Sequence, residues 1–203
     1  MTNDGESAGG ITAAELMAKL AADREYQRKK QAFDQDLADR KAAWLLAQLP
    51  LLAELRSVGV EVESVWDLVQ REEPYPSALP VLFRYLEAGD LPDRVLEGVG
   101  RAMAVKPSIT YWDQLVNVLK SASSEGQKEG AAVALAACAT PAKVPNLIEI
   151  LNETERIGQH MYLVRPILSE GGLVGRAFVE TLLSDDVLST EAGALLQGRQ
   201  PST

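Results

Sequence analysis

The chain has 203 residues, one cysteine and a formal charge of -9 at neutral pH. A single cysteine excludes an intramolecular disulfide and a cysteine-rich metal site, and the negative charge argues against a general affinity for nucleic acid or anionic membranes. No apolar run approaches the roughly 18 residues of a membrane helix, so we predict a cytoplasmic protein without membrane contact.

Residues 1–10 predict a disordered leader, because three glycines and few apolar side chains cannot offset the entropy of ordering. The sequence becomes helical after Ile11. Thr12 and Glu15 have the spacing of a capping box, in which the two side chains bond the backbone of a helix start. Leu16 and Leu20 then share one face, so a short amphipathic helix is expected.

A long helix is predicted from Asp23, which suits a helix N-cap, to Val58. Phe33, Leu37, Arg40 and Trp44 follow one another at spacings of four, three and four residues, the rhythm of helices that pair side by side. The first half is too polar for a core, so it either stays in solvent or finds another helix.

The second half of this helix is rich in leucine and is expected to pack on the body of the protein. Pro50 predicts a kink there, because proline removes a backbone donor and crowds the preceding turn. Gly59 suits the helix end. Residues 11–58 are therefore predicted to form an N-terminal helical extension, and residues 59–203 a separate domain.

Ser64 and Asp67 predict the start of a short helix within "SVWDLVQ". From Pro76 onward, apolar helical blocks that end in leucine recur at intervals of 33, 32 and 32 residues, at Leu86, Leu119, Leu151 and Leu183. Each block is followed by a second helical block, and three of these second blocks carry a glutamate at the matching place, at Glu97, Glu129 and Glu191. A two-helix repeat of this length is typical of an α-solenoid.

Glycines and alanines gather in the second blocks. Gly98, Gly100 and Gly130 interrupt helical sequence at a cost of roughly 0.5–1 kcal/mol each relative to alanine. Small residues let neighbouring helix axes approach closely, so we interpret them as packing features. A glycine-rich phosphate loop would need a strand before the glycines and a turn that carries them.

The paired blocks of residues 76–199 resemble HEAT repeats of the armadillo-type superhelix group, and "PYPSALPVLFRYLEAGDLPDRVLEGVGRAMAVK" is similar to bacterial HEAT-repeat proteins. The resemblance implies an all-α superhelix of about four hairpins that contacts other proteins. No catalytic residue carries over from it. The third unit departs from the pattern, because Gly158–His160 and Pro166 interrupt its second helix and predict a kink.

Individual residues that could perform chemistry have simpler structural interpretations. Cys138 lies among alanines without a cationic neighbour, as a buried inert thiol would, and a lone His160 cannot form a histidine metal site. The consecutive acids at 72–73 and 185–186 flank element breaks and suit helix caps. We predict no catalytic, cofactor or metal residues.

The expected function is a scaffold or adaptor that binds another protein on the concave face of the repeats. The candidate contact residues are Phe33, Leu37, Tyr75, Tyr85, Arg94, Arg101 and Tyr111. Tyrosine and arginine are frequent at interface hot spots. Phe33 and Leu37 lie on the polar half of the long helix, where nothing local buries them, so this helix predicts a second contact or a homodimer.

Two alternatives stay open. Some HEAT-like solenoids are enzymes, such as DNA glycosylases or bilin lyases, and a glycosylase would need a basic groove. The second helices offer a basic strip of Arg94, Arg101, Lys128, Arg156, Arg165 and Arg199. Alternatively, an acidic inhibitor or immunity-type protein would use the acids that surround Trp66: Glu61, Glu63, Asp67, Glu72 and Glu73.

Overall fold

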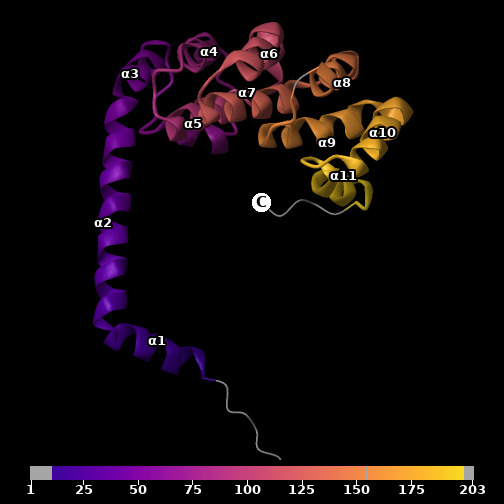
Figure 1. Ribbon diagram of the computed structural model, residues 1–203. Helices are drawn as coiled ribbons and strands as arrows, with labels where there is room; N and C mark the ends of the chain where they lie inside the picture. The colour runs from indigo at the N-terminus through magenta and orange to yellow at the C-terminus, as the bar shows by residue number, and fades with distance from the viewer. Residues whose placement is uncertain (1–10, 154, 199–203) are drawn as a thin grey trace, which may run out of the picture. The chain divides into compact units, whose positions relative to one another are not determined.

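The computed structural model describes residues 11–153 and 155–198, and this part of the chain is all helical, without a strand (Figure 1). The predicted all-α class is therefore confirmed, while the predicted leader at 1–10 lies outside the described residues. The α-helices are α1 Ala13–Ala22, α2 Arg24–Ala47, α3 Leu49–Ser57, α4 Leu79–Ala88, α5 Asp93–Ala102, α6 Trp112–Ser121, α7 Glu125–Cys138, α8 Val144–Glu153, α9 Met161–Glu170, α10 Gly172–Thr181 and α11 Ser189–Leu196. Short 3-10 helices lie at η1 Val65–Gln70, η2 Pro76–Ala78, η3 Lys106–Tyr111, η4 Pro141–Lys143, η5 Gly158–His160 and η6 Leu182–Ser184.

The chain divides into two compact units, Met1–Ala43 and Trp44–Thr203. The described part of the first unit holds α1 and most of α2, and neither helix has a buried residue. Hydrogen bonds between residues close in sequence cap the starts of both helices. Thr12 and Glu15 form the predicted capping box, and Asp23 caps α2, where its Oδ1 accepts from the backbone N–H groups of Glu25 (2.9 Å) and Tyr26 (3.1 Å).

The predicted long helix is interrupted at Gln48, where α2 ends and α3 begins with Pro50 in its first turn. The buried Gln48 side chain accepts from the backbone N–H of Val65 at 2.8 Å. Helix α3 then buries Leu51 and Leu55 fully. The second unit therefore begins at Trp44, earlier than the predicted boundary after residue 58.

The predicted helix end at Gly59 and the predicted helix start at Ser64 are both present. Gly59 has a positive φ of 83°, and the backbone N–H of Val60 reaches back to the carbonyl of Leu55, which closes the helix end. Ser64 and Asp67 form a capping box, although the helix they start, η1, is a 3-10 helix.

Four consecutive helix pairs follow: α4 and α5, α6 and α7, α8 and α9, and α10 and α11. Within each pair the two helices pack together, and the second helices also contact one another in succession, α5 with α7, α7 with α9 and α9 with α11. Figure 1 shows α5, α7 and α9 following one another on one side of this unit and α4, α6 and α8 on the other. In the third pair, the predicted departure takes the form of η5 just before α9, and Pro166 lies inside α9.

Helices α5 and α7 approach closely at two of the glycines that interrupt the helical sequence, Gly100 and Gly130. A Cβ on Gly100 would lie 2.0 Å from the Cα of Gly130, so no side chain fits between the two backbones. Gly98 similarly lies under Trp66, whose Nε1 would be 2.8 Å from an added Cβ. The interpretation of these glycines as packing features is confirmed.

A buried glutamine joins two successive pairs. Gln127 of α7 donates from Nε2 to the backbone carbonyls of Leu86 (2.8 Å) and Glu87 (3.3 Å), which lie in the last turn of α4. Gly89, with a φ of 69°, follows the last residue of α4 and lies directly against this amide. The end of α4 is therefore completed by a side chain from the following pair.

Across residues 11–153 and 155–198, no helix combines the length and apolar character needed to span a membrane.

Candidate protein-binding groove

An open groove of about 710 Å³ lies on the side formed by the second helices. Helices α7 and α9 form most of it, and α5 and α11 contribute one residue each. We refer to it as the second-helix groove, and its lining residues are Arg101, Lys106, Val133, Ala136, Ala137, Ala139, Met161, Tyr162, Arg165, Pro166, Ser169, Glu170 and Glu191.

The groove exists because α7 presents short side chains. Ala136 and Ala137 occupy the turn of α7 that faces α9, and methyl groups leave the space between the helices unfilled. On the opposite wall, Met161 is 40% exposed and Pro166 contributes an apolar ring. The walls are therefore largely apolar yet reached by solvent, the usual character of a binding site.

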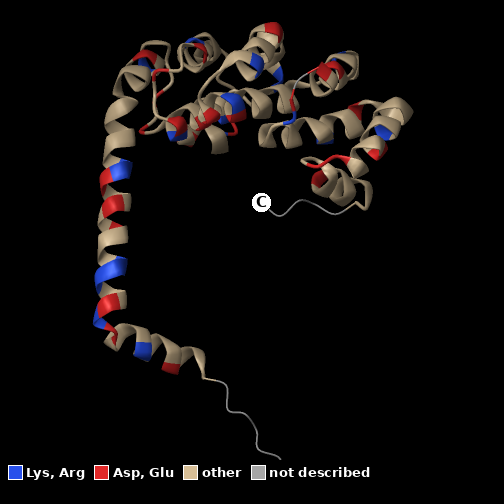
Figure 2. Cartoon of the chain, in the orientation of Figure 1, with Lys and Arg blue, Asp and Glu red and all other residues tan. Residues whose placement is uncertain are grey.

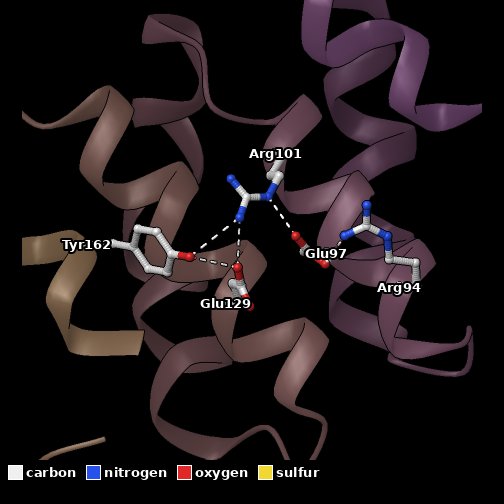
Figure 3. Close-up of polar contacts among 5 residues, drawn as sticks. All are labelled: Arg94, Glu97, Arg101, Glu129 and Tyr162. Atoms are coloured by element: carbon white, nitrogen blue, oxygen red, sulfur yellow. Dashed lines mark hydrogen bonds and ion pairs between the residues drawn. The ribbon is translucent and has the colours of Figure 1, made fainter. Parts of the chain in front are cut away.

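A polar cluster borders the groove and connects three second helices (Figure 3). Arg101 of α5 donates through Nε to Glu97 at 2.8 Å and through Nη2 to Glu129 of α7 at 2.8 Å. Tyr162 of α9 donates its hydroxyl to the same Glu129 oxygen at 2.7 Å. Arg94 completes the cluster with a 2.7 Å ion pair to Glu97. Burial and the hydrogen bond to Glu129 raise the pKa of Tyr162, so its proton stays in place.

Other charges of the groove have no such internal partner. Arg165, Glu170 and Glu191 line the groove without an ion pair to any described residue. Among the described residues, Lys106 donates to the backbone carbonyl of Ala139, at 3.2 Å, and to no carboxylate. Glu191 is the last of the three glutamates that occur at matching places in the repeats, and in contrast to Glu97 and Glu129 it forms no ion pair with a described residue.

The candidate tyrosines are placed differently from expectation. Tyr75 is 7% exposed, and its hydroxyl lies within hydrogen-bond distance of the carbonyl oxygens of Ala102 (2.9 Å) and Leu68 (3.2 Å), so it lies in the core and not on the exposed surface expected of a contact residue. Tyr85 is half-buried and donates to Glu54 at 2.9 Å. Tyr111 is half-buried and stacks on Phe83, with ring centroids 5.0 Å apart.

The remaining candidates fall in two places. Arg94 and Arg101 both belong to the polar cluster beside the groove, and the structure brings them together through Glu97. Phe33 and Leu37 belong to the first unit, where Phe33 is 61% exposed and Leu37 is half-buried on α2.

The predicted basic strip is largely neutralised. Arg94 and Arg101 are paired with glutamates, Lys128 pairs with Glu125 at 3.2 Å and Arg156 with Asp185 at 2.9 Å. Arg199 lies outside the described residues. Of the remaining strip, Arg165 alone keeps an unpaired charge in the described part of the chain, so the charges do not add into a basic groove.

Trp66, at the centre of the acidic stretch, lies beneath Arg94, whose Cζ is 3.9 Å from the ring centroid. Asp67 accepts from the backbone N–H groups of Glu63 (3.0 Å) and Ser64 (2.9 Å). Both residues therefore have structural roles within the second unit.

Cys138 and His160 are buried, as a structural role requires. Burial raises the pKa of the Cys138 thiol to about 11, which leaves it protonated and unreactive. Burial and the neighbouring Arg156 lower the pKa of His160 to about 4, so the ring is neutral. Asp185 accepts from Arg156 and from two backbone N–H groups, which is a capping role. No group of three metal-ligating side chains occurs among the residues that the structure describes.

Sequence reasoning missed Met161, Tyr162 and the unpaired acids of the groove. Tyr162 carries a recognisable signal, because it follows Glu129 by 33 residues and thus occupies nearly the same repeat position one unit later. Met161 gives no such signal in the sequence, although it is 40% exposed in the structure.

No protein-family model, curated protein or solved structure matches this chain.

Proposed function

We propose that the second unit is a short HEAT-like solenoid that binds a segment of another protein in the second-helix groove and catalyses no reaction. The pairing of the helices, the 32-residue recurrence and the succession of second-helix contacts support this assignment of the repeats. Successive units of a solenoid expose their second helices on one face, and the groove lies on that face.

The observation that carries the proposal is the combination of apolar walls with unpaired charges. Ala137 and Met161 offer an apolar surface that a partner's aliphatic or aromatic side chain would cover. Arg165, Glu170 and Glu191 then offer both signs of charge to the rim of the contact. A protein segment that carries an apolar anchor flanked by an acidic and a basic residue satisfies all of these groups.

No contact in residues 11–153 and 155–198 favours the alternative functions. Four of the cations that a glycosylase would need are engaged by neighbouring carboxylates, and Trp66 and Asp67 of the acidic stretch are engaged in the fold. Neither alternative therefore has a specific observation in its favour.

The test compares two variants that each replace an exposed apolar side chain with a carboxylate. Met161→Glu changes the groove, whereas Leu173→Glu changes an 87% exposed position on α10 outside it. Wild-type protein and both variants are used in quantitative affinity capture from the native host. We expect a partner whose yield falls about tenfold or more with Met161→Glu and stays unchanged with Leu173→Glu. Identical partner sets for both variants would reject the groove as the binding site.

A further inference from the structure

Helix α2 carries a row of five side chains, three of them apolar, and none of the five is buried by the described residues. Tyr26, Lys30, Phe33, Leu37 and Arg40 follow one another at spacings of four and three residues, which puts them on one side of the helix. Phe33 is 61% and Tyr26 39% exposed. An isolated helix cannot bury such a row, but two copies of it can.

The charges of α2 decide how two copies would meet. Figure 2 shows basic and acidic bands alternating along the helix. In a parallel pair, each row residue faces its own copy, so Lys30 would meet Lys30 and Arg40 would meet Arg40. Both contacts are repulsive, and they would fall inside the seam, where water screens them least.

An antiparallel pair centred between residues 31 and 32 removes both conflicts. Lys30 then faces Phe33 of the second copy, which provides a cation–π contact, and Tyr26 faces Leu37. Arg40 faces Asp23, a residue of opposite charge. In the same register Lys29 flanks Asp36 of the second copy on both sides of the two-fold axis.

We propose that α2 mediates self-association, through an antiparallel pairing with α2 of a second copy in this register. The ion pairs that Lys29 and Asp36 already form within α2 do not prevent this pairing. Lys29 bonds Glu25 and Asp36 bonds Arg40, but all four side chains are more than half exposed, so these pairs contribute little and are readily exchanged. The proposal is independent of the second-helix groove.

The first experiment is sedimentation velocity on the full chain over increasing concentration at low salt, for wild type, Phe33→Glu and Gln31→Glu. Both variants add one negative charge to α2. Phe33→Glu places it in the row, and Gln31→Glu places it beside the row. We expect wild type and Gln31→Glu to dimerise and Phe33→Glu to stay monomeric. A wild-type chain that remains monomeric up to about 1 mM, or a Phe33→Glu chain that dimerises as wild type does, overturns the proposal.

The second experiment tests the direction of the pairing by mixing Lys29→Glu with Asp36→Lys. In the antiparallel register each variant alone brings like charges together, whereas the mixed dimer restores two attractive pairs, so it should associate about tenfold more tightly than either variant alone. In a parallel pair, Lys29 would instead flank Asp34, and mixing would bring no gain. Each substitution also removes an ion pair within its own helix. This loss is the same whether a variant is alone or in the mixture, so it does not affect the comparison. A mixture that associates no better than its components overturns the antiparallel register.

Discussion

At the scale of single residues, His160 is a titratable group held almost wholly out of solvent. It is 1% exposed, and its Nδ1 faces the backbone N–H of Ile157 at 3.5 Å. Arg156 adds positive charge nearby, and together with burial it holds the pKa of the imidazole at about 4, whereas an unfolded chain titrates near 6.5. The unfolded state therefore binds a proton at a higher pH than the folded state does.

This difference predicts a pH dependence of stability. Keeping His160 neutral in the folded state adds to the free energy of unfolding. This stabilisation is fully present above pH 6.5 and is lost as the pH falls toward about 4, and the total loss is about 3 kcal/mol. Urea unfolding at pH 7, 6 and 5 measures it, with His160→Gln as the control that should lack this slope. Because the chain has one histidine, its NMR signal is unambiguous, and a midpoint near 6.5 in the folded protein would contradict the prediction.

At the scale of helices, the contact of α5 with α7 sets the spacing of the first two pairs. Gly100 and Gly130 meet backbone to backbone, while the one described side chain within 4 Å of a Cβ added to Gly193 in α11 is Leu183, at 3.8 Å. The same substitution at the two places therefore has opposite consequences.

We expect Gly100→Ala to lower the free energy of unfolding by about 2–3 kcal/mol, because the methyl group forces the two helices apart. Gly193→Ala should instead raise it by about 0.5–1 kcal/mol, through the higher helix propensity of alanine. Chemical denaturation measures the free energy of unfolding of both variants. Equal values for the two variants would refute the backbone contact between Gly100 and Gly130.

Most helices were predictable from the sequence, because the period of apolar residues and the capping residues are local signals. Thr12, Ser64 and Gly59 each mark a helix end through bonds to residues within five positions. The type of helix at 65–70 was not predictable from local signals, since its capping box suits an α-helix start equally well, and its contact with α5 joins segments distant in sequence. The burial of Tyr75 was missed for the same reason, because its acceptor Ala102 lies 27 residues away.

The groove itself was only partly predictable. Arg101 was identified by type, as an arginine on a second helix, but the space beside it depends on Ala136 and Ala137 of another helix. A sequence shows that these alanines permit close packing. It does not show where that packing stops and an open surface begins.

At the scale of the whole molecule, the first unit contributes no buried side chain in α1 or α2, whereas the core belongs to the second unit. We therefore expect a chain truncated to residues 44–203 to keep its free energy of unfolding within about 0.5 kcal/mol of the full chain. Guanidinium unfolding followed by tryptophan fluorescence measures this, since all three tryptophans remain: Trp44, Trp66 and Trp112.

The truncation also separates stability from association. If the truncated chain unfolds as the full chain does but no longer dimerises, self-association belongs to residues 1–43, as a pairing through α2 requires. A truncated chain that aggregates or loses more than about 2 kcal/mol would instead mean that residues 1–43 support the core.

The amide of Gln127 has a consequence for how this protein opens. Since a side chain of α7 holds the last carbonyls of α4, the terminal turn of α4 cannot fray while α7 remains in place. Backbone amides at the end of α4 should therefore exchange with deuterium only as fast as those of α7, and Gln127→Ala should uncouple the two rates. We therefore expect the first two helix pairs to open together, with the later pair controlling the earlier one.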